Sequence, residues 1–132
     1  MRIKNITLII TSITIFILFS FSHVFAQCYS IQTATSKGSC FNLVLKGKQD
    51  CKGKMRVGFH DQKTQSGYWL NDSYSMLKGK THGSSGCYDA KRAITPSPLL
   101  DYRPDKRLLT SSASKNFIVI ELDGKLEKTF YW

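Results

Sequence analysis

Hydrophobic and polar residues alternate along residues 41–60, and this pattern predicts β-strands. The odd positions carry six apolar side chains: Phe41, Leu43, Leu45, Met55, Val57 and Phe59. The even positions include five cations: Lys46, Lys48, Lys52, Lys54 and Arg56. Successive side chains of a strand point to opposite sides. The pattern therefore predicts a hairpin centred on Asp50, with the apolar residues paired on one face and the five cations together on the other.

Shorter signals follow along the chain. Residues 67–70 are typical of another short strand, whereas residues 73–78 are expected to form a single helical turn capped by Asp72. Residues 79–86 are rich in Gly, Ser and Thr and are expected to form an exposed loop. A second short helical turn is expected at residues 98–102, in a proline-rich region.

The C-terminal segment predicts a second hairpin, with its turn at Asp123-Gly124. A two-residue turn would place Ile120 opposite Glu127. A loop with an odd number of residues would instead place Ile118 opposite Phe130, which suits a core on one side and is the register we favour.

These features together predict the fold class. Short apolar runs are separated by turn residues, and no segment shows long helical periodicity. We expect an all-β domain, either a small antiparallel β-sandwich or a partly open barrel. It would be stabilised by disulfides and contain at most one or two short helical turns.

The first 26 residues have the features of a secretory signal peptide. Arg2 and Lys4 are followed by an uncharged apolar run over residues 6–21, and Val24-Phe25-Ala26 offers a cleavage site. We therefore expect a secreted or periplasmic protein whose single mature domain spans residues 27–132.

The four cysteines all lie in the expected mature domain, and an even number in a small exported chain predicts two disulfides. In the predicted hairpin, Cys40 lies at the base and Cys51 near the tip, too far apart to pair. We predict the pairs Cys28–Cys40 and Cys51–Cys87. The combination of Cys28–Cys51 with Cys40–Cys87 stays open as an alternative.

Charge indicates the class of partner. Removal of the leader, which contains Arg2 and Lys4, takes the formal net charge from +10 to +8. A field of this sign attracts anionic polymers, glycans that bear acidic groups, and membrane surfaces. The candidate binding residues are the predicted basic face and one aromatic side chain: Lys46, Lys48, Lys52, Lys54, Arg56 and Trp69. We interpret the protein as a small binding module for an anionic or glycan-bearing partner, with nucleic acid less favoured.

Two other classes of function stay open. His60 and His82 could serve as acid and base in a small ribonuclease-like hydrolase, although the chain has no complete catalytic signature. A protein–protein effector, such as an inhibitor, toxin or immunity protein, would use the loops at residues 79–105. The sequence contains no metal-ligand spacing and no phosphate-binding loop, so we predict neither a metal site nor a cofactor.

The leader generates the first testable prediction. Because small residues stand at the −3 and −1 positions before Gln27, the exported protein should begin at Gln27. Intact-mass analysis of exported protein checks this, and retention of residues 1–26 would contradict it.

Overall fold

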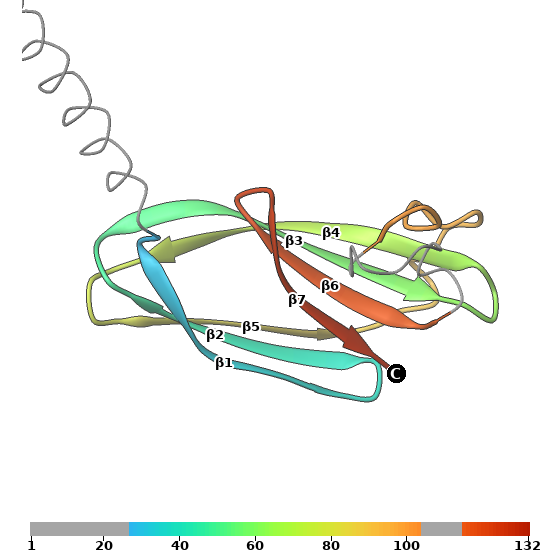
Figure 1. The fold of residues 1–132 in the computed structure, drawn as a ribbon, viewed down its shortest axis with the longest axis horizontal. Helices are drawn as coiled ribbons and strands as arrows, with labels where there is room; N and C mark the ends of the chain where they lie inside the picture. Colours follow the sequence, from blue (N-terminus) through green and yellow to red (C-terminus); the bar gives the residue numbers. More distant parts are fainter. Residues whose placement is uncertain (1–26, 104–114) are drawn as a thin grey trace, which may run out of the picture.

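The computed structural model describes residues 27–103 and 115–132, which form two antiparallel β-sheets packed face to face (Figure 1). The three-stranded sheet has the order β1-β2-β5, with β1 (Tyr29–Lys37), β2 (Cys40–Gly47) and β5 (Thr81–Cys87). The four-stranded sheet has the order β4-β3-β6-β7, with β3 (Cys51–Asp61), β4 (Ser66–Met76), β6 (Phe117–Leu122) and β7 (Lys125–Tyr131). The predicted all-β sandwich is confirmed.

The predicted hairpin between residues 41 and 60 is wrong. Both strands exist, but β2 pairs with β1 and β5, whereas β3 pairs with β4 and β6. The six apolar side chains are nevertheless buried in one core, because they face each other between the sheets. Phe41 and Phe59, for example, have ring centroids 6.1 Å apart. Period-two alternation predicts which side of a strand is buried, but it does not distinguish a neighbouring strand from an opposing sheet.

Two disulfides stabilise this arrangement, and the predicted pairing is wrong while the alternative is confirmed. Cys28, which directly precedes β1, pairs with Cys51, the first residue of β3. This disulfide links the two sheets near the connection between β2 and β3. Cys40 pairs with Cys87, its direct cross-strand partner between β2 and β5. The preferred pairing failed because it was derived from the hairpin that the structure does not form.

Two segments expected to be irregular are strands. Residues 73–76 continue β4, because Tyr74 and Met76 alternate into the core opposite Gly53 and Cys51. Residues 81–87 form β5 instead of an exposed loop, although Gly and Ser have low β-propensity. Strand β5 is held by its ladder with β2 and by the Cys40–Cys87 disulfide. The strand expected at residues 67–70 is confirmed as part of β4.

The C-terminal hairpin has the two-residue turn, so the favoured loop with an odd number of residues is wrong, although its pairing of Ile118 with Phe130 is confirmed. Asp123 and Gly124 have positive φ angles of 52° and 80° and form a two-residue turn. A β-bulge then shifts the register between Ile120 and Glu121, so that Ile118 still pairs with Phe130. One extra residue on the bulged strand thus reconciles a tight turn with a one-sided core.

A second, smaller core lies on the outer face of the four-stranded sheet. The segment after β5 crosses this face and buries Leu99 against Phe117 and Val119, with Trp69 and Tyr102 packed around them. Residues 98–101 form turns instead of the expected helical turn, and none of the described residues is helical. This segment covers only one half of the outer face.

The predicted signal peptide lies outside the described residues. Among residues 27–103 and 115–132, no helix is long and apolar enough to cross a membrane.

Gly58 provides a test of the second core. A Cβ atom at this position would lie 2.5 Å from Leu99 Cδ2, 2.8 Å from Trp69 Cζ3 and 2.9 Å from Val119 Cγ2. Because all three neighbours are packed, we expect Gly58→Ala to lower the free energy of unfolding by about 1–3 kcal/mol. Urea denaturation measures this change.

Gly83→Ala is the matched control, since a Cβ there meets no atom within 4 Å. It should change the free energy of unfolding by less than about 0.5 kcal/mol. Equal effects of the two substitutions would contradict the close packing at Gly58.

Candidate functional site

The half of the outer face that the 97–103 segment leaves open carries two columns of polar side chains. Because Met55 and Val57 point into the core, the even residues of β3 point outward. Three rows join β3 to β4 in direct register: Lys52 with Ser75, Lys54 with Ser73, and Arg56 with Asn71. Each row pairs a cation with a neutral hydroxyl or amide. We call these six residues the polar array.

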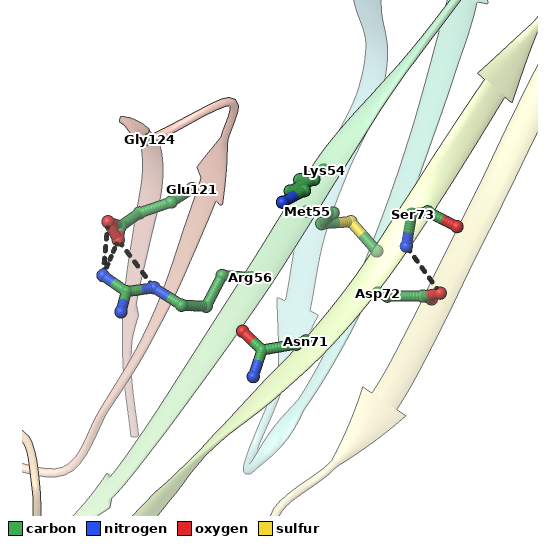
Figure 2. A pocket seen from close by; sticks show the side chains of 8 residues that line it. All are labelled: Lys54, Met55, Arg56, Asn71, Asp72, Ser73, Glu121 and Gly124. Carbon is green, nitrogen blue, oxygen red and sulfur yellow. Dashed lines mark hydrogen bonds and ion pairs between the residues drawn. The ribbon is translucent and has the colours of Figure 1, made fainter.

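The array borders a surface hollow, which Figure 2 shows from close by. A cavity of about 640 Å³ is lined by residues of β3, β4, β6 and the β6–β7 turn: Lys54, Met55, Arg56, Asn71, Asp72, Ser73, Glu121 and Gly124. A second hollow of about 350 Å³ shares Lys54 and Ser73 with it and adds Lys52 and Ser75. The two hollows therefore follow the β3–β4 pair over the length of the array.

Arg56 is the most firmly positioned member of the array. Its Nη2 donates to both carboxylate oxygens of Glu121, at 2.9 and 2.7 Å, and its Nε donates to Oε2 at 3.3 Å. The guanidinium carbon also lies 3.7 Å from the ring centroid of Trp69. A planar guanidinium satisfies both contacts at once, because it can be bidentate to a carboxylate while it stacks on an aromatic ring.

This anchoring orients the rest of the Arg56 side chain. Figure 2 shows the second terminal nitrogen, Nη1, directed away from Glu121. The Arg56 side chain is 43% exposed and that of Glu121 only 8% exposed, so the carboxylate is the buried partner. Arg56 thus offers fixed hydrogen-bond donors to a ligand, while Glu121 balances its charge.

Lys52 and Lys54 are the two exposed lysines of the array. Within the described part of the chain, neither forms an ion pair. Asp123 does not neutralise them through a salt bridge, since its carboxylate accepts the Lys54 backbone N–H at 2.9 Å and the Tyr74 hydroxyl. Burial and this hydrogen bond raise the pKa of Tyr74 above its ordinary value. Both ammonium groups are therefore available to an anion.

The structure does not bring all the predicted binding residues together. Lys46 lies on the outer face of the three-stranded sheet, opposite Ser30 and Thr81, and Lys48 lies in the loop between β2 and β3. The expectation that five cations share one face is wrong, because β2 and β3 belong to opposite sheets and their outer faces point away from each other. Trp69 lies beside the array, with one ring face covered by Arg56.

The two histidines are also separated. His60 is fully buried on β3 of the four-stranded sheet, where its Nδ1 lies 2.8 Å from Ser97 Oγ and its ring stacks on Phe117. His82 lies on β5 of the other sheet. Although His60 and Ser97 resemble a base and a nucleophile, both are buried, and Ser97 Oγ also accepts the Leu99 N–H at 3.1 Å. We interpret this contact as the anchor of the covering segment.

The remaining candidate sites are a metal site and the effector loops. Among residues 27–103 and 115–132, no three His, Cys, Asp or Glu side chains are grouped so that they could hold a metal ion. The region expected to act as effector loops is occupied over residues 81–87 by β5, and Leu99 anchors the segment that follows.

Sequence reasoning identified three residues of the array on β3 and missed its second column on β4. Asn71, Ser73 and Ser75 alternate with Tyr74 and Met76, which are buried. This period of two indicates a strand, and in the structure it prevails over the helical turn expected after Asp72. Glu121 was missed because a single acidic residue in an apolar strand does not indicate which cation it faces.

Comparison of the sequence with protein-family models gives no match, and comparison with curated proteins gives none. The two disulfides are consistent with an extracellular location.

The pair formed by Arg56 and Glu121 generates a stability prediction. Arg56→Gln should lower the free energy of unfolding by about 1–3 kcal/mol, because it leaves a buried carboxylate without its cation. The exposure of Arg56 to solvent keeps this cost below that of a fully buried pair. In a double-mutant cycle measured by urea denaturation, Glu121→Gln should recover part of the loss. Strictly additive effects would contradict the coupling.

Proposed function

We propose that the protein is a secreted or periplasmic binding module that recognises an anionic or glycan-bearing partner through the polar array. One observation carries this proposal: Lys52 and Lys54 lie without ion pairs in the described structure, beside an anchored arginine and along two neighbouring hollows that share Lys54 and Ser73. The hollow beside Arg56, at about 640 Å³, falls within the size range of ligand sites.

Electrostatics supports an anionic partner. Lys52 and Lys54 are two residues apart on β3 and therefore point to the same side of the sheet. Their Cα atoms are about 6.6 Å apart, and their positive charges repel each other. An anion that contacts both ammonium groups would replace this repulsion with attraction. The net charge of +8 on residues 27–132 adds a long-range field that favours the encounter.

The proposal includes an exported location and excludes a role as a hydrolase. The leader and the two disulfides support an exported protein, as an oxidising compartment favours disulfides. A two-histidine hydrolase is less well supported, because His60 is buried and lies on a different sheet from His82. Binding without turnover is therefore the function that we assign.

Two charge-matched double variants test the proposal. Lys52→Gln/Lys54→Gln removes two cations from the array, whereas Lys46→Gln/Lys48→Gln removes two cations that lie elsewhere. Mature protein is titrated with heparin, a densely anionic polysaccharide, over a series of salt concentrations. The first variant should bind heparin several-fold more weakly, and its affinity should depend less on salt. For duplex DNA, each lost phosphate contact reduces the slope of log affinity against log salt concentration by about 0.9, and we expect a change in the same direction for heparin.

The Lys46→Gln/Lys48→Gln variant should retain most of the affinity. All four side chains are exposed, so both variants should unfold at the same urea concentration as the wild type. An equal loss of affinity in the two variants would show that total charge, and not the array, determines binding. That result would overturn the proposed site.

A further inference from the structure

We infer that the ligand of the polar array is a linear acidic polysaccharide that lies along β3 and β4, with its acidic groups on the β3 cations and its hydroxyl groups on the β4 side chains. This inference rests on the proposed function and deepens it, because it names the class of ligand and its direction on the sheet. Three properties of the array support it.

The first property is the shape of the array. Its three rows repeat every second residue of two extended strands, and so the array is about 13 Å long. Its two columns are only about 5 Å apart. The hollows beside it share Lys54 and Ser73 and follow the same direction. A long, narrow array suits a single extended chain better than a compact anion.

The second property is the chemistry of the β4 column. Ser73 and Ser75 present hydroxyl groups and Asn71 presents an amide, and all three are exposed beside a cation. Hydroxyl and amide groups both donate and accept hydrogen bonds, which matches the hydroxyl groups of a sugar. A chain of phosphates offers acceptors but few donors, so it would leave the acceptor capacity of this column unused.

The third property is the set of groups that surrounds the array. Proteins that bind single-stranded nucleic acid provide aromatic side chains on which bases stack. Across the described residues that line the two hollows, the aromatic side chain is Tyr74, which is buried in the core. One face of the Trp69 ring is already covered by Arg56. Nucleic acid would therefore bind through charge alone.

The distribution of charge in the array also favours a polysaccharide over nucleic acid. Glu121 balances Arg56, and the Asp72 carboxylate, which also lines the larger hollow, accepts the Ser73 backbone N–H at 2.8 Å. Lys52 and Lys54 are then the array cations without an ion pair in the described structure. Two such cations give little affinity for a polyphosphate at moderate salt. Selectivity must then come from the neutral hydrogen bonds of the β4 column, which a polysaccharide can satisfy.

The test removes these neutral groups and keeps every charge. Asn71→Ala/Ser73→Ala alters the β4 column, and Asn42→Ala/Ser85→Ala is the matched control. Asn42 and Ser85 form a cross-strand pair of the same residue types on the outer face of the other sheet. Mature wild type and both variants are titrated with heparin oligosaccharides, with alginate, and with oligothymidylate as the nucleic acid.

We expect Asn71→Ala/Ser73→Ala to bind heparin oligosaccharides and alginate at least about fivefold more weakly, since two hydrogen bonds are lost. Its weak binding to oligothymidylate should not change, and the control variant should bind all three ligands as the wild type does.

Two results would overturn the inference while the proposed function stands. One is an equal loss of affinity for oligothymidylate and for the polysaccharides. The other is unchanged polysaccharide binding by Asn71→Ala/Ser73→Ala, in a protein whose binding still depends on Lys52 and Lys54. The proposed function fails separately, if Lys52→Gln/Lys54→Gln and Lys46→Gln/Lys48→Gln weaken binding equally.

Discussion

Burial of the alternate apolar side chains of β2 against those of β3 is the contact on which the rest of the structure depends. Phe41 and Phe59 meet between the sheets, and the other apolar members of both strands join the same core. Because neighbouring residues of a strand point to opposite sides, this burial forces the intervening residues outward. The outward directions are opposite for the two strands, since each belongs to a different sheet. The core thus separates Lys46 from Lys52, Lys54 and Arg56.

The outer face of the four-stranded sheet is divided at Arg56. On one side, Leu99 packs into a second core, in close contact with the sheet at Gly58, where a Cβ atom would occupy the position of its side chain. On the other side, the face is polar and open. Arg56 contacts both halves, because its guanidinium stacks on Trp69 and binds Glu121 while Nη1 points away from that carboxylate. The covering segment therefore stabilises the fold on the half that does not carry the polar array.

The sequence was sufficient to predict the fold class and the buried side of β2 and β3, because both follow from periodicity. It was not sufficient to predict which strands pair. The same alternation fits a hairpin and two opposed sheets. Because the predicted disulfide pairs and the predicted basic face were both derived from the hairpin, they were wrong as well. Strand β5 carried no local signal, since its ladder to β2 and the Cys40–Cys87 bridge hold a Gly- and Ser-rich segment in place. At Asp123-Gly124 the local turn signal was correct and the longer loop was wrong, because a β-bulge places Ile118 opposite Phe130 without it.

The polar array is therefore independent of the interactions that stabilise the domain. Its members are outward positions of β3 and β4, and with the exception of Arg56 they contribute no side chain to the described ion pairs. The core residues between them, such as Met55 and Tyr74, fix the spacing of the rows through the backbone. Because the side chains concerned are exposed, we expect the fold to tolerate substitutions at Lys52, Lys54, Asn71, Ser73 or Ser75. Arg56 is the exception, because the buried carboxylate of Glu121 couples its position in the site to the stability of the sheet.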